Sequence, residues 1–178
     1  KMIMATIEKV NPRDYNTVAD FLEADATYQN ERGKLGSAQG RVSVDPLELL
    51  GDMVKVANNS GVKLARLSGN RYNDGEREFT RSGIEKRFGT WTIARTFAVE
   101  AVELRIIDEN GKVSSHGIAQ DIYRIAVENS INTLELTRDK YFTQGKFGKN
   151  TIENRFGSWV AAREQASKIA SKNTVSLR

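Results

Sequence analysis

The sequence contains no cysteine, a single histidine and only two prolines in 178 residues. The absence of cysteine excludes disulfide bonds and thiolate metal sites, and one histidine excludes the His-rich clusters of metalloenzymes and H-N-H nucleases. No run of about 18 apolar residues occurs, and no charged-then-apolar leader opens the chain, so we expect neither a membrane span nor a signal peptide. This composition is typical of a soluble intracellular protein. We expect it in the cytoplasm, associated with the nucleoid or, in a host cell, wherever the DNA is.

Positive charge is concentrated in two parts of the chain. The overall net charge is +4, but residues 49–98 alone carry +4 and residues 118–172 carry +3. Residues 1–48 and residues 99–117 each carry −2. Two basic regions of this kind are typical of polyanion binding, although moderate local charge also occurs on proteins with no such partner.

The two basic regions contain a repeated sequence. The segment IEKRFGTWTIAR at residues 84–95 returns as IENRFGSWVAAR at residues 152–163, with eight of twelve positions identical. The repeat predicts two tandem units of about 50 residues each. Further upstream, the aligned positions are Asp52–Ala57 with Asp121–Ala126, Leu67 with Leu136, and Tyr72 with Tyr141.

Helix signals recur along the chain and predict a mainly α-helical protein. Asn11-Pro12 and Asp45-Pro46 each combine a capping residue with proline in the first turn, so they predict two helix starts. The glycine-rich residues 33–40 predict a loop between these helices. The expected domains are an N-terminal helical segment and loop (1–45), a first repeat (46–98), a helix extension and connector (99–117), a second repeat (118–172) and a tail (173–178).

Stop signals set the expected ends of the other helices. Asn58-Asn59-Ser60-Gly61 and Asn110-Gly111 contain residues that tolerate positive φ, and such residues commonly end helices. The expected helices extend from Asp45 to about Asn59, from about Ser115 to about Ser130, and from Thr90 to about Ile107, with a strand over Val102–Ile107 as the alternative to the last part.

The shared motif R-F-G-[ST]-W predicts a short helix, a sharp turn and a second helix, in a helix-turn-helix-like arrangement. In the first copy, Ser82 and Glu85 fit a capping box, Ile84 and Phe88 share an inward face, and Gly89 supplies the turn. Thr90 and Ser158 are expected to cap the second helices, and the two tryptophans to pack inward. The equivalent residues of the second copy are Asn150, Glu153, Ile152, Phe156 and Gly157.

Packing does not explain the arginine that both copies retain, Arg87 and Arg155. An arginine beside a helix N-terminus suits a phosphate contact, although it can also be solvated or lie across a tryptophan. The first turn of the same helix differs between the copies, as in the contrast of Lys86 with Asn154. In the major groove, lysine suits guanine and asparagine suits adenine, but any two exposed surfaces also diverge after duplication. The candidate DNA-binding residues are Arg81, Lys86, Arg87, Lys149, Thr151, Asn154 and Arg155.

Each copy consists of an apolar helix with alanine, a leucine, a tyrosine, a short loop and then the pattern [SN]-x-I-x-x-R-F-G-[ST]-W-x-x-A. This arrangement resembles the homing-endonuclease-associated repeat. The resemblance covers about residues 47–98 and 118–170 and implies a helical DNA-binding module. Because this repeat often lies next to H-N-H nuclease domains, it also implies a nuclease domain or partner, for which this chain has no counterpart. The customary A-G-L ending is replaced by FAV at residues 97–99 and by QAS at residues 165–167. The resemblance extends to Arg87, Phe88, Gly89, Trp91, Arg155, Phe156, Gly157 and Trp159.

The sequence contains no catalytic constellation that we can identify. His116 stands alone, Asp108-Glu109 fits a turn, and the acidic residues of the first helix fit a solvated face. No glycine-rich phosphate loop with a G-K-[ST] ending follows a strand. We therefore expect a non-enzymatic, sequence-preferring binder of double-stranded DNA without cofactor or metal, either a regulator or the recognition part of a nuclease system. The alternatives are a protein-interaction repeat and an enzyme with a site in residues 1–45.

Overall fold

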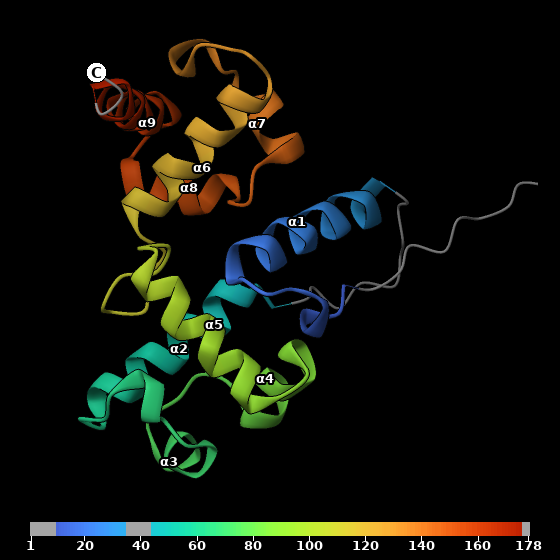
Figure 1. Ribbon diagram of the computed structural model, residues 1–178, viewed down its shortest axis with the longest axis vertical. Coiled ribbons are helices and arrows are strands. Elements are labelled where there is room, and N and C mark those ends of the chain that lie inside the picture. The colour runs from blue at the N-terminus through green and yellow to red at the C-terminus, as the bar shows by residue number, and fades with distance from the viewer. Residues whose placement is uncertain (1–9, 35–43, 176–178) are drawn as a thin grey trace, which may run out of the picture. The chain divides into compact units, whose positions relative to one another are not determined.

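The computed structural model describes residues 10–34 and 44–175 (Figure 1). The described residues are mainly α-helical, which confirms the expected fold class. No strand forms among them, and an isolated bridge joins Ile107 to Val113. The chain divides between residues 101 and 102 into two compact units, each of which has its own core.

The helices of each unit follow one order. In both, a helix of 14 residues precedes a 3-10 turn, two short helices and a longer helix. The first unit contains η1 (Pro12–Asp14), α1 (Val18–Lys34), α2 (Pro46–Asn59), η2 (Leu64–Arg66), α3 (Gly69–Asp74), α4 (Arg81–Phe88) and α5 (Trp91–Glu103), of which α5 ends just beyond the division. The second contains α6 (Ser115–Glu128), η3 (Thr133–Glu135), α7 (Arg138–Gln144), α8 (Lys149–Phe156) and α9 (Trp159–Val175).

The N-terminal helix begins later than its proline predicts. The Asn11 side chain accepts the backbone N–H of Arg13 at 3.2 Å, but it caps only the 3-10 turn η1. α1 begins at Val18, whose N–H donates to Glu100 of α5 at 2.8 Å. α1 continues through Gly33 to Lys34, so the predicted start of the loop at Gly33 is wrong, and the rest of that predicted loop, residues 35–40, lies outside the described part of the chain.

The start of α2 agrees with its sequence signal, whereas the end of α5 does not. Asp45 accepts the N–H of Leu47 at 2.8 Å, as expected of a helix cap. α5 ends at Glu103, so both the extension to Ile107 and the strand alternative are wrong. The chain turns at Arg105, which has a φ of 56° and whose carbonyl accepts from the Ser114 hydroxyl.

Aromatic packing differs between the two units. In the first unit, Phe88 is fully buried between Phe21 of α1 and Phe97 of α5, with ring centroids 5.6 and 6.2 Å away. The equivalent Phe156 is only half-buried. The position equivalent to Phe97 is Gln165, and the described second unit has no helix that corresponds to α1. Burial of the motif phenylalanine is therefore confirmed fully in the first copy only.

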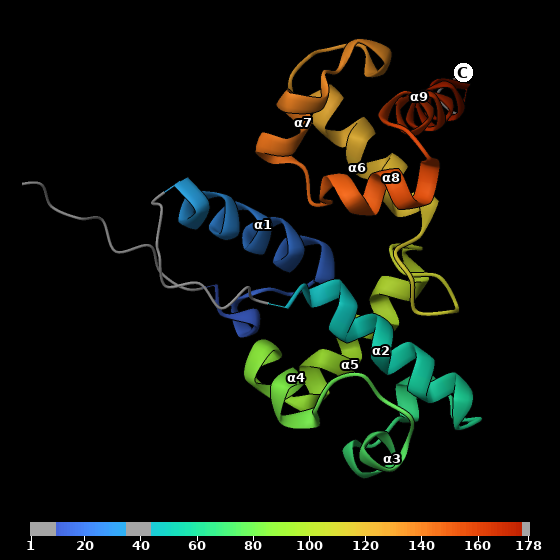
Figure 2. The same cartoon turned by 180° about the vertical axis from the view of Figure 1, so that it is seen from behind.

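The motif tryptophans pack on tyrosines in both units. Trp91 is 9% exposed and its ring lies 5.2 Å from that of Tyr72, while Trp159 is half-buried and lies 5.2 Å from Tyr141. α9, which Trp159 opens, packs against α6, and Figure 2 shows it end-on beside that helix. The expected inward packing of the tryptophans is therefore confirmed, more completely in the first unit.

Candidate nucleic-acid interface

α4 and α8, the first helix of the motif in each copy, begin earlier than the capping boxes predict. The Thr80 hydroxyl caps α4 by accepting the backbone N–H three residues on, at 3.1 Å. Gly148 occupies the cap position of α8 and makes no side-chain cap bond. Ser82 and Asn150 lie within the first turns, so both capping-box predictions are wrong. An earlier cap leaves Glu85 in the middle of α4, where it is available to pair with a cation.

The turn that follows each helix has the expected geometry. Gly89 and Gly157 have φ values of 81° and 76°, a conformation that glycine adopts without steric cost. Thr90 and Ser158 then cap the next helices, each accepting the backbone N–H three residues on at 3.2 Å. The helix, sharp turn and helix of the motif are therefore confirmed in both copies.

The outward faces of α4 and α8 contain the residues in which the copies differ. Ile84 and Ile152 are buried, and two residues further on Lys86 and Asn154 are exposed. Thr151, in the first turn of α8, is half-buried. The structure therefore places the contrasting pair of side chains in solvent, on equivalent positions of two similar helices.

Arg87 makes an internal ion pair. Its Nη2 atom lies 2.6 Å from Oδ2 of Asp25 in α1, and the two side chains are 10% and 6% exposed. The guanidinium also lies 5.9 Å from the centre of the Phe21 ring. Arg87 Nε and the second oxygen of Asp25 are buried without a hydrogen-bond partner. Little of this guanidinium can reach a phosphate while α1 stays in place.

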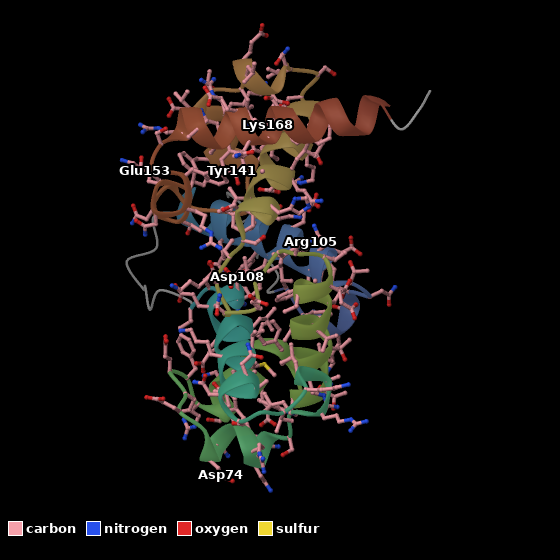
Figure 3. All side chains as sticks on the ribbon, turned by 90° about the vertical axis from the view of Figure 1, so that its left-hand side faces the viewer. Asp74, Arg105, Asp108, Tyr141, Glu153 and Lys168 are labelled. Atoms are coloured by element: carbon pink, nitrogen blue, oxygen red, sulfur yellow. The ribbon has the colours of Figure 1, made fainter. Side chains whose placement is uncertain are left out.

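Arg155 pairs with a different segment of the chain. Its Nη2 atom lies 2.6 Å from Oδ2 of Asp108, in the turn before α6 (Figure 3). Burial alone would raise the pKa of Asp108, but hydrogen bonds from the Lys112 backbone N–H, the Arg155 guanidinium and the Asn110 backbone N–H together lower it. The carboxylate is therefore charged at neutral pH. Because the Arg155 side chain is 32% exposed, its guanidinium remains accessible to a second anion.

The first-turn cations Arg81 and Lys149 lie near the glutamate that both copies share. Arg81 Nε is 2.8 Å from Oε1 of Glu85, and its guanidinium lies 6.0 Å from the centre of the Trp91 ring. Lys149 Nζ is 3.8 Å from Oε1 of Glu153, which Figure 3 labels on α8. Both cations are more than one third exposed, so these ion pairs are weak and a phosphate can replace the carboxylate.

Each copy also contains a buried Asp–Tyr pair that no local sequence pattern indicates. The Tyr141 hydroxyl donates to Asp121 at 2.8 Å, and Tyr72 donates to Asp52 in the same way. Asp121 also accepts the backbone N–H of Lys146 at 2.8 Å. Burial raises the pKa of both tyrosines, so the phenols stay protonated and able to donate. These pairs hold the short helices α3 and α7 on α2 and α6. Their signal in the sequence is that both residues recur at one offset.

The described residues contain no group of three histidine, cysteine or acidic side chains that could hold a metal ion. His116 is exposed in the first turn of α6. Within the same ranges, no helix is both long and apolar enough to cross a membrane. No protein-family model, curated protein or solved structure matches this chain. A functional assignment therefore depends on the geometry of the two copies.

Proposed function

We propose that this chain binds double-stranded DNA with a sequence preference, as a regulator or as the recognition part of a nuclease system. The observation that carries the proposal is the exposure of Lys86 and Asn154 at equivalent positions of α4 and α8. Both helices lie in regions of net positive charge, and both have eight residues and end at a glycine. Similar helices with different outward side chains suit two modules that read different bases.

In this proposal α4 and α8 each enter the major groove. Lys86 favours guanine, whose edge presents two acceptors, and Asn154 favours adenine, whose edge presents a donor and an acceptor. Arg81, Lys149 and Arg155 contact phosphates, since their internal ion pairs are at least partly exposed. Thr151 supports these contacts from the first turn of α8. The resemblance to the homing-endonuclease-associated repeat favours the same partner.

Two different modules on one chain predict an asymmetric DNA site. A palindromic site would require two equivalent readers, as in a symmetric dimer. Selection from randomised duplex DNA, followed by sequencing, measures this directly. We expect one preferred sequence whose two halves differ. A selected pool in which no sequence is enriched would contradict sequence readout.

The salt dependence of binding to duplex DNA tests the proposal itself. If each copy contacts about three to five phosphates, the log-log slope of affinity against salt is on the order of −5 to −9, at about −0.9 per phosphate. If the chain is instead a protein-interaction repeat, we expect no salt-dependent binding to duplex DNA. An enzyme acting on DNA predicts cleavage of the same duplex on addition of a divalent metal ion. Failure to bind duplex DNA at low salt would refute the proposed function.

A further inference from the structure

The two copies can be compared position by position for positive charge. Within the aligned segments, both copies carry a cation at five positions. A cation retained at one place in both copies either stabilises the fold or meets something outside it, and the contacts of each side chain separate these two roles. The five pairs are Lys55 with Arg124, Arg71 with Lys140, Arg81 with Lys149, Arg87 with Arg155, and Arg95 with Arg163.

At four of these positions, the cationic side chain contacts another part of the protein in both copies. The pairs at Arg81 and Lys149 and at Arg87 and Arg155 have acidic partners, as described above. The remaining contacts join Lys55 to Glu78 at 2.5 Å, Arg124 to Asp121 at 2.8 Å, Arg95 to the Leu67 carbonyl at 3.3 Å, and Arg163 to the Leu136 carbonyl at 3.1 Å.

The fifth position, Arg71 and Lys140, is different. Both residues are exposed, and neither side chain makes a hydrogen bond or an ion pair with the described part of the chain. The residue that follows each is the buried tyrosine bonded to aspartate, Tyr72 or Tyr141. This bond fixes the rotation of α3 and α7. Both helices lie at the edges of their own units (Figures 1 and 2).

We infer that Arg71 and Lys140 contact equivalent phosphates of the DNA backbone, one from each copy. The inference rests on the proposed DNA binding and adds a contact on α3 and α7, outside the motif helices. A phosphate that binds here displaces no carboxylate, unlike one that replaces Glu85 at Arg81 or Glu153 at Lys149. Because α3 packs on α4 within the first unit, a cation on α3 is held at a fixed position relative to the helix that carries Lys86. Phosphate contacts of this kind set the register of a reading helix on the duplex.

The double variant Arg71→Gln with Lys140→Gln tests this inference in the full chain. Each lost phosphate contact reduces the magnitude of the salt slope by about 0.9, so we expect a reduction of about 1.8 relative to the unchanged protein. The preferred sequence in a selection experiment stays the same, because phosphates carry no base information. Both side chains are exposed, so circular dichroism and the melting temperature should change little.

Two controls separate a contact from a general loss of charge. The variant Lys63→Gln with Lys168→Gln removes the same charge from exposed residues at positions that are not equivalent, and its slope should stay unchanged. Arg71→Lys keeps the charge and should also keep the slope. An unchanged slope in the Arg71→Gln, Lys140→Gln variant, or an equal reduction in the charge control, overturns the inference while leaving DNA binding intact. Absence of binding by the unchanged protein overturns both the proposed function and this contact.

Discussion

Replacement of the motif arginine should have very different effects in the two copies. Arg87→Ala leaves the carboxylate of Asp25 buried without its cation, and breaking a buried pair in this way costs about 3 to 5 kcal/mol. Arg155→Ala breaks a pair whose side chains are 32% and 23% exposed, and pairs with water access contribute about 1 kcal/mol or less. The two substitutions are chemically identical and occupy equivalent positions, so each is the matched control of the other.

Thermal unfolding followed by circular dichroism measures this difference. For a unit of this size, 1 kcal/mol corresponds to about 4 to 8 °C, so Arg87→Ala should lower the melting temperature of its unit by at least about 12 °C. Adding Asp25→Asn to Arg87→Ala should recover part of the loss, because it removes the uncompensated charge. Equal and small losses in both copies would refute the structural role of the Arg87–Asp25 pair. A loss of DNA affinity with unchanged stability would instead indicate that Arg87 contacts a DNA phosphate.

Three further outcomes follow from the comparison of the copies. Ser130 has a φ of 53° where the first copy has Gly61, so Ser130→Gly should stabilise the protein by about 0.5 to 1 kcal/mol in denaturant unfolding, and Gly61→Ser should do the opposite. Folding raises the pKa of Tyr72 and Tyr141, so their contribution to the free energy of unfolding should be fully present below about pH 10 and should fall at higher pH. Because Tyr72→Phe removes one of these groups, the free energy of unfolding of that variant should fall less steeply above about pH 10. Lys86→Asn should change the selected sequence in one half of the DNA site; uniformly weaker binding with the same sequence would make Lys86 a backbone contact.

Some signals confined to a few neighbouring residues predicted the structure correctly, whereas the helix start at Asn11-Pro12 and the two capping boxes were wrong. Asp45-Pro46 starts α2 as expected, and Gly89 and Gly157 form the expected turns, because cap bonds and backbone φ depend on adjacent atoms. The start of α4 was placed wrongly because Thr80 and Ser82 are both good caps only two residues apart. The structure places the hydroxyl of Thr80, rather than that of Ser82, at the cap.

Contacts between distant residues could not be predicted from the sequence. The partner of Arg87 lies 62 residues away, and that of Arg155 lies 47 residues away in a turn. Neither aspartate belongs to the aligned repeat. The pairing of Tyr141 with Asp121 is an intermediate case, because both residues recur in the aligned segments but nothing local indicates that they meet.

The two motif arginines share an acidic partner in kind but not in origin. Asp25 comes from a helix and Asp108 from a turn, so the two carboxylates have no common origin in the repeated segment. Each unit has nevertheless placed an anion 2.6 Å from its arginine. Both motif arginines therefore pair with an anion, and the source of that anion differs. In the first unit α1 encloses the pair, whereas Arg155 stays open to a second anion. DNA phosphate should therefore compete for Arg155 before Arg87, and the second copy should contribute more of the motif's share of the salt slope.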